Sequence, residues 1–152
     1  MKIVIQRVLH ASVTADGVPA GKCGHGLLLL VGVVQGDTER DAEILAAKIA
    51  KMRIFTDEAG KMNRSLPDVG GSVLAVSNFT LAADISHGNR PSFTDAEKPD
   101  AADRLYEYFC ARLRAEGVPV ETGVFGADMQ IDMTADGPIT ILADSEIWKT
   151  ER

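Results

Sequence analysis

Residues 27–34 read LLLLVGVV, and residues 73–76 read VLAV. Short, continuous apolar runs such as these indicate strands that are buried on both faces of a sheet. Between the two runs, apolar residues recur at spacings of three and four behind Thr38, which predicts a helix over 38–52. A strand, a helix and a second strand in this order indicate an α/β fold.

The same patterns extend the prediction to both ends of the chain. Residues 2–14 alternate between apolar and polar types, as a half-buried strand does, and a turn follows them. A second helix is predicted over 99–116, because Pro99 suits its first position and Gly117 follows its last one. Further strands are expected over 120–124, 129–133 and 139–143, the last two joined by a turn at 135–138.

The chain has 152 residues, a length that fits one domain with a sizeable core. The predicted elements indicate a sheet-rich α/β domain whose two helices pack on one face of the sheet, a layered α/β/β arrangement. No linker or change in composition divides residues 1–152. Residues 144–152 are expected to form a peripheral tail.

The charge of the chain limits its partners. With 22 acidic against 16 basic side chains, the formal net charge is -6. This balance argues against a protein that coats nucleic acid electrostatically, and DNA is not an expected partner. It leaves open a protein that touches RNA at one small place. The basic cluster of the chain consists of Lys48, Lys51, Arg53, Lys61 and Arg64. This cluster is interpreted either as a solvated helix face or as a rim that contacts phosphates.

The sequence also bears on the cellular compartment. No secretory signal is visible, and the longest apolar run is far shorter than the ~20 residues that a membrane-spanning helix needs. Cys23 and Cys110 are widely separated and form no C-x-x-C motif, which favours reduced thiols over a disulfide. We therefore expect a cytoplasmic protein that makes no contact with a membrane.

Common catalytic and metal-binding motifs are missing from the sequence. The three histidines, His10, His25 and His87, are scattered and show no ligand spacing. The sequence contains no G-x-S-x-G, no P-loop and no dinucleotide-binding glycine motif. We therefore expect neither a metal nor a cofactor.

Two motifs stand out from the pattern of strands and helices. Ser77-Asn78-Phe79-Thr80-Leu81 ends a buried strand just before a long polar loop over 82–99, where functional sites often form. Thr80 could act as a nucleophile only with a base beside it, and no neighbour in sequence supplies one. Asp136-Gly137-Pro138-Ile139-Thr140 has the composition of a hairpin turn. Composition does not predict a cis proline there, since only about 5–6% of such bonds are cis in folded proteins.

Together these motifs resemble the S-Q-F-T-L and G-P-V-T motifs of the D-aminoacyl-tRNA deacylase family. The resemblance covers nearly the whole chain, up to about Ala143, and its strength lies in the ordered set of matches. Further segments that fit the family in order are 5–8, 11–13, 53–55, 60–63, 70–73, 90–93 and 127–130. The resemblance therefore implies the deacylase fold for this domain.

The resemblance also implies a reaction and a partner. The family hydrolyses, without a metal, the ester that joins a D-amino acid to the terminal ribose of tRNA, so the partner would be the aminoacylated 3′ end of tRNA. The backbone N–H groups around Phe79 and Thr80 would stabilise the oxyanion. Thr80 would be either the nucleophile or a positioning residue beside the ribose 2′-OH, and we favour the second role.

Discrimination against L-amino acids is implied for Gly137 and Pro138. In the family, a Gly-Pro pair in cis enters the active site of the other subunit, which predicts a homodimer and a steric clash with L side chains. Glycine would escape this clash, so mischarged glycyl-tRNA(Ala) becomes a second expected substrate. Arg7 resembles the residue that braces the Gly-Pro segment, and Phe125 and Met129 resemble residues near the terminal adenosine.

One departure from the family motif is Asn78, where the family usually has Gln. Asn keeps the amide group but is one methylene shorter. Two other functions stay open at this stage. One is a module that binds RNA ends without turnover, and the other is a general hydrolase of D-amino acid esters.

Overall fold

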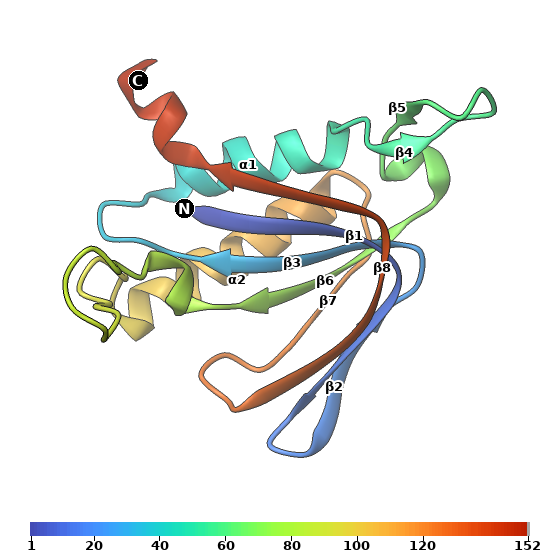
Figure 1. The fold of residues 1–152 in the computed structure, drawn as a ribbon. Helices are drawn as coiled ribbons and strands as arrows, with labels where there is room; N and C mark the ends of the chain where they lie inside the picture. Colours follow the sequence, from blue (N-terminus) through green and yellow to red (C-terminus); the bar gives the residue numbers. More distant parts are fainter. Residues whose placement is uncertain (152) are drawn as a thin grey trace.

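The computed structural model describes residues 1–151, with side chains through Lys149. Figure 1 shows one strongly curved sheet with helices packed against one of its faces. The strands are β1 (Lys2–Ala15), β2 (Val18–Cys23), β3 (Gly26–Gly32), β4 (Phe55–Thr56), β5 (Met62–Arg64), β6 (Ser72–Ser77), β7 (Val120–Thr122) and β8 (Met129–Asp144). The helices are α1 (Glu39–Lys51) and α2 (Pro99–Ala115), with short 3-10 helices η1 (Pro67–Val69), η2 (Phe79–Ala82) and η3 (Ser145–Glu151).

The main sheet has the order β2-β1-β3-β6-β7, and β8 pairs with the other edge of β1. The first half of β1 pairs with β3 and its second half with β2, both antiparallel. The β3–β6 and β6–β7 pairs are parallel, and their crossovers contain α1 and α2. Both helices lie on the same face of the sheet (Figure 1). The predicted sheet-rich α/β fold with two helices on one face is therefore confirmed.

The core lies on both faces of the sheet. Leu27 and Leu29 of β3 are fully buried in the large cluster between the sheet and the helices. Leu28 points to the opposite face, where it packs in a smaller cluster with Val13 and Leu74 inside the curve of the sheet. Because side chains alternate along a strand, only a strand buried on both faces needs such a continuous apolar run.

The two helices begin where the sequence predicts. The Thr38 N–H and hydroxyl donate to Asp41 Oδ2, at 2.8 and 3.2 Å, and satisfy the start of α1. Pro99 is the first residue of α2, a position at which its missing N–H costs nothing. None of the helices in the described residues is long and apolar enough to cross a membrane.

The C-terminal part of the sheet differs from the prediction. β8 is one strand of 16 residues, so the expectation of two strands joined by a turn at 135–138 is wrong. Its pairing with β1 runs from Met129 opposite Ala15 to Asp144 opposite Lys2, with register shifts between. The Gly137-Pro138 bond is cis and lies within this strand. The local preference of Asp-Gly for a tight turn is overridden because the long β1 pairs with both halves of β8.

The end of β6 is a second difference. The motif 77–81 was expected to form the end of the buried strand, but β6 ends at Ser77, and the chain turns there into the 3-10 helix η2. The Asn78 N–H still donates to Val31 O at 2.8 Å, but its side chain then accepts a hydrogen bond from the Thr80 N–H. A side chain that bonds the backbone two residues on competes with a strand ladder, which ends the strand at this point.

The N-terminus joins the segment before α1 to the beginning of η3, two parts of the chain that are distant in sequence. The Met1 ammonium group is buried and donates to Asp37 Oδ1 at 2.6 Å and to Ser145 Oγ at 2.7 Å. Lys149 adds a second ion pair with Asp37 at 3.3 Å. The beginning of the segment expected as a peripheral tail, 144–152, is therefore attached to the body of the domain through buried contacts.

Replacing Asp37 with alanine is expected to lower the free energy of unfolding by about 3–5 kcal/mol, because a buried ammonium group is left without its carboxylate. Urea unfolding of the wild type and the variant measures this loss. Asp95→Ala removes an exposed carboxylate and is the matched control, with an expected change below about 0.5 kcal/mol. Equal losses in the two variants would contradict a structural role for the buried pair.

Candidate active site

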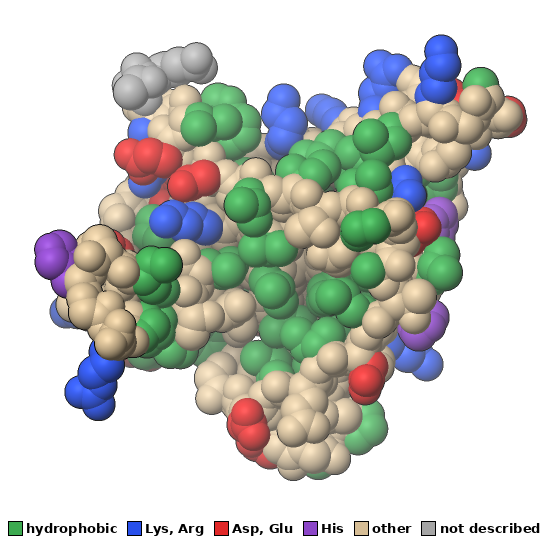
Figure 2. Space-filling view, viewed as in Figure 1, with side chains coloured by type: hydrophobic (Ala, Val, Ile, Leu, Met, Phe, Trp, Pro, Cys, Tyr) green, Lys and Arg blue, Asp and Glu red, His purple; other side chains and the backbone are tan. Residues whose placement is uncertain are grey.

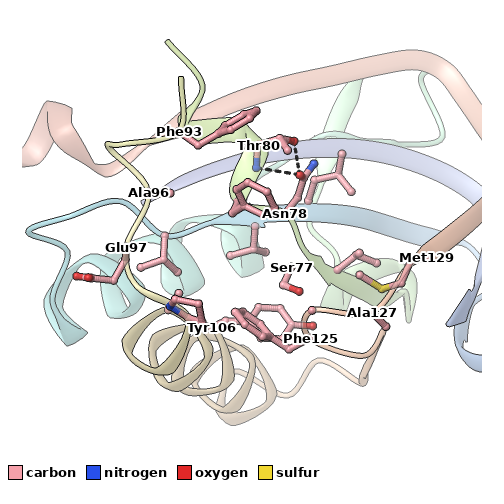
Figure 3. Close-up of a pocket in the computed structure, with 18 of the residues that line it drawn as sticks. Ser77, Asn78, Thr80, Phe93, Ala96, Glu97, Tyr106, Phe125, Ala127 and Met129 are labelled. Atoms are coloured by element: carbon pink, nitrogen blue, oxygen red, sulfur yellow. Dashed lines mark hydrogen bonds between the residues drawn. The ribbon is translucent and has the colours of Figure 1, made fainter. Parts of the chain in front are cut away.

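A cavity of about 870 Å³ opens at the carboxyl ends of the parallel strands β3 and β6. It lies between η2, the beginning of α2 and the segment that joins β7 to β8 (Figure 3). Ligands of sheets with parallel strands are commonly bound beyond the carboxyl ends of these strands. The fold therefore places this cavity where a substrate site is expected.

The structure separates the predicted site residues into two groups. The first group lines the cavity and consists of Ser77, Asn78, Phe79, Thr80, Phe125 and Met129. The second group is Arg7, Gly137 and Pro138, which are not among the cavity residues and meet on β1 and β8. The family resemblance implies that these two groups serve one active site from different subunits.

The inner wall of the cavity is apolar and aromatic. Tyr106 of α2 and Phe125 lie side by side with their ring centroids 6.3 Å apart (Figure 3). The Tyr106 hydroxyl donates to Ala75 O at 2.7 Å, and burial raises its pKa far above the ordinary value. Because this hydroxyl is buried and already bonded, Tyr106 shapes the wall and is not suited to transfer a proton.

The rim of the cavity carries two exposed aromatic rings. Phe79 of η2 is 58% exposed and meets Phe93 edge to face, with ring centroids 5.2 Å apart. The sequence patterns do not single out Phe93 or Tyr106 as site residues. An apolar residue within the polar loop 82–99 was an available signal for Phe93. No local signal marks Tyr106, whose place in the cavity depends on how α2 packs.

The polar end of the cavity is the turn from β6 into η2. The Thr80 hydroxyl donates to Asn78 Oδ1 at 2.5 Å, and the Thr80 N–H donates to the same oxygen at 3.2 Å (Figure 3). In the described part of the chain, the Phe79 N–H has no hydrogen-bond partner. Among the residues that line the cavity, this turn therefore carries one backbone donor without a partner and one oriented hydroxyl.

The second group is held by Arg7. This side chain is largely buried and donates from Nη1 to Ile54 O at 2.8 Å, while its Nε lies 3.2 Å from Asp136 Oδ2. Gly137 follows Asp136 with φ +125°, and a Cβ at this residue would lie 2.8 Å from Ile139 N. Gly137 and Pro138 are exposed in the chain. Arg7 therefore fixes the base of an exposed segment.

The fold places the chain in a class of small α/β proteins that includes two solved structures. One is described as "c-Myc DNA Unwinding Element Binding Protein" and superposes with a TM-score of 0.87 at 37% identity, covering 95% of this chain and 98% of that one. The other is described as a probable eukaryotic D-amino acid tRNA deacylase. It superposes with a TM-score of 0.79 at 18% identity, covering 93% of this chain and 97% of that one. At this identity, the similarity supports the fold alone.

The chain belongs to the family described as D-Tyr-tRNA(Tyr) deacylase, whose sequence profile matches residues 4–144. The D-aminoacyl-tRNA deacylase of Ruegeria pomeroyi is 60% identical, over 95% of this chain and 99% of that protein. The D-aminoacyl-tRNA deacylase of Lacticaseibacillus casei is 55% identical, over 96% of this chain and 99% of that protein. The family resemblance predicted from the motifs is therefore confirmed, and the chain is a hydrolase that acts on ester bonds.

Proposed function

We propose that this chain hydrolyses the ester between a D-amino acid and the terminal ribose of tRNA, and that it spares L-aminoacyl-tRNA. The observation that carries the proposal is the separation of the two residue groups. The cavity contains the groups that suit ester hydrolysis, while an exposed and braced Gly-Pro segment lies elsewhere on the same chain. A second copy of the chain brings the two groups together.

Hydrolysis of an aminoacyl ester passes through a tetrahedral intermediate with a developing oxyanion. The free N–H of Phe79 is the donor that we assign to this oxyanion. We assign Thr80 a positioning role, because its hydroxyl is bonded to an amide oxygen and not to a base. The 2′-OH of the ribose, which adjoins the ester, would help to orient the attacking water.

Chiral selection would come from Gly137 and Pro138 of the second subunit. Their carbonyl oxygens would face the α-ammonium group and the Cα of the bound amino acid, leaving no space for an L side chain. The support in this chain is that both residues are exposed and that Arg7 holds the base of the segment through Asp136 and Ile54. Rejection by a steric clash leaves the D isomer free to point its side chain outward.

A homodimer is supported by the exposed β8. Among the residues that the structure describes, β1 is the only strand that pairs with β8, so the other edge of this 16-residue strand presents unpaired backbone groups. Ile131, Met133 and Leu142 of β8 are exposed, and Figure 2 shows apolar side chains gathered on the face that β8 crosses. A long edge strand with exposed apolar residues favours association with another copy.

The same geometry predicts a second substrate. Glycine has no side chain, so it cannot clash with the Gly-Pro carbonyls, and glycyl-tRNA(Ala) would be hydrolysed along with the D-aminoacyl forms.

The net charge of -6 suits an enzyme that holds only the aminoacylated 3′ end of tRNA in the cytoplasm. The basic cluster lies on α1, on the β4–β5 hairpin and on the segment between them (Figure 2), and it remains a candidate for contact with phosphates.

The test of the proposed function is a comparison of three substrates. The protein is incubated with D-Tyr-tRNA, L-Tyr-tRNA and a D-tyrosine ester that lacks tRNA. We expect selective loss of the D-aminoacyl-tRNA. Binding of aminoacyl-tRNA without hydrolysis would instead indicate a module for RNA ends. Equal cleavage of the free ester would indicate a general hydrolase of D-amino acid esters.

A further inference from the structure

Asn78 makes contacts that determine which polar groups of the turn are free. Its Oδ1 accepts one hydrogen bond from the Thr80 N–H and another from the Thr80 hydroxyl. Its own N–H is bonded to Val31 O of β3 at 2.8 Å, and its carbonyl accepts from the Leu81 N–H at 3.4 Å. Asn78 therefore uses both its backbone and its side chain to hold the turn.

The first consequence concerns the hydroxyl of Thr80. Because an amide oxygen can only accept, the hydroxyl proton lies on the side of Asn78. An amide oxygen is also too weak a base to remove this proton, so the contact does not activate Thr80 as a nucleophile. The lone pairs of Thr80 Oγ1 remain available to accept a hydrogen bond from a water or a ribose hydroxyl in the cavity.

The second consequence concerns the backbone donors. The N–H groups of Asn78, Thr80 and Leu81 are all bonded within the protein. In the described residues, the Phe79 N–H is the donor of this turn without a partner. The sequence-based expectation that the Thr80 N–H also stabilises the oxyanion therefore conflicts with its bond to Asn78 in this chain.

We propose that Asn78 is a positioning residue, which makes Thr80 a hydrogen-bond acceptor toward the substrate and leaves the Phe79 N–H as the single oxyanion donor of the turn. This proposal rests on the proposed deacylase function and deepens it. It gives the short Asn side chain a specific role at the position where the resembling family usually has Gln.

The packing below the turn keeps this geometry in place. A Cβ at Gly32 would lie 2.9 Å from Leu81 Cβ and 3.0 Å from Asn78 O, so β3 and the turn are in close contact. Because the backbone of Asn78 is fixed on β3, its short side chain reaches Thr80 and no further. Such fixed positions matter because a misplacement of about 1 Å in an active site can reduce the rate about 10²-fold.

The test is a double-mutant cycle with Asn78→Ala and Thr80→Val. Asn78→Ala alone is expected to lower kcat for D-Tyr-tRNA about ten- to hundredfold with KM changed by less than about threefold. The double variant should have a kcat less than about threefold below that of Thr80→Val alone, because the hydroxyl that Asn78 orients is already gone. Asn78→Asp keeps the accepting oxygen and should restore most of kcat. Losses that multiply fully in the double variant would overturn the proposal.

A matched control separates this role from local stability. In the neighbouring loop, Asp84 Oδ1 accepts a hydrogen bond from the Ser86 N–H at 2.9 Å. This bond has the same pattern as the one between Asn78 and Thr80, because a side-chain oxygen accepts from the N–H of the residue two positions later. Asp84→Ala should keep kcat within about twofold of the wild type, because exposed positions outside special features have small effects. A loss in Asp84→Ala equal to that in Asn78→Ala would overturn the proposal.

Amide hydrogen exchange tests the contact without substrate. The Thr80 amide should exchange at least about tenfold more slowly in the wild type than in Asn78→Ala, since its hydrogen bond is lost in the variant. The Phe79 amide should exchange without protection in both. An unprotected Thr80 amide in the wild type would overturn the proposal. Absence of deacylation by the wild type would instead refute the proposed function, and this exchange measurement would still decide the contact.

Discussion

Replacing Gly137 with valine is expected to lower kcat/KM for D-aminoacyl-tRNA at least about 10²-fold. Gly137 has φ +125°, a conformation that L side chains rarely adopt, and its Cβ would lie 2.8 Å from Ile139 N and from Ile139 Cγ1. The variant must therefore move the segment that, in our proposal, faces the substrate in the partner subunit. Steady-state deacylation of D-Tyr-tRNA measures the loss.

The control for this variant is Gly17→Val. Gly17 has φ +81° in the β1–β2 turn, and a Cβ there would meet no atom within 4 Å. Both variants carry the penalty of a positive φ, about 1–2 kcal/mol. Gly17→Val should keep its activity, since its strain is confined to a turn that is not part of the cavity lining. Equal activity in the two variants would contradict the role that we assign to Gly137.

Replacing Phe79 with proline is expected to lower kcat about 10²–10³-fold, the usual effect of losing one oxyanion donor. Proline removes the N–H of residue 79 and leaves the remaining backbone intact. The substitution suits the fold, because Phe79 is the first residue of η2 and Asn78 before it is extended, with φ -151° and ψ 94°.

Phe79→Ala is the matched control, because it removes the ring but keeps the N–H. We expect it to affect KM more than kcat, since the exposed ring lies at the rim of the cavity and pairs with Phe93. Pre-steady-state measurements on D-Tyr-tRNA separate the two effects. Similar kcat values for the proline and alanine variants would show that the N–H is not the donor.

The sequence predicted those parts of the fold that depend on short segments. The run at 27–34 indicated a strand buried on both faces, and the alternation of Leu27, Leu28 and Leu29 between two core clusters explains why every position is apolar. Thr38 and Pro99 marked the beginnings of the helices, since capping and the missing proline N–H are local properties.

The errors lie where distant parts of the chain compete with local preference. The Asp-Gly pair at 136–137 favours a turn, yet β1 pairs with the strand on both sides of it. Asn78 ends β6 because its side chain captures the Thr80 N–H, which a pattern of apolar residues does not reveal. In both places, the hydrogen-bond partners of the backbone depend on contacts that cannot be read from the local composition.

The candidate site was predicted only in part for the same reason. Residues 77–80 of the motif do line the cavity, but Phe93 and Tyr106 reach it through the packing of a loop and a helix. Arg7 resembles a family residue that braces Gly137, and its bonds to Ile54 O and Asp136 link three segments that are distant in sequence. The partners of Arg7 are visible only in the folded chain, because they depend on how these three segments pack.

The central claim is that each active site combines the cavity of one subunit with the Gly-Pro segment of the other, and mixed dimers test it most directly. Gly137→Val and Phe79→Pro chains, each inactive alone, are unfolded together, refolded as a mixture and assayed with D-Tyr-tRNA. Random pairing yields one intact site in each mixed dimer, so about a quarter of wild-type activity is expected. Activity no higher than that of the separate variants, in a mixture shown to contain mixed dimers, would contradict the shared site.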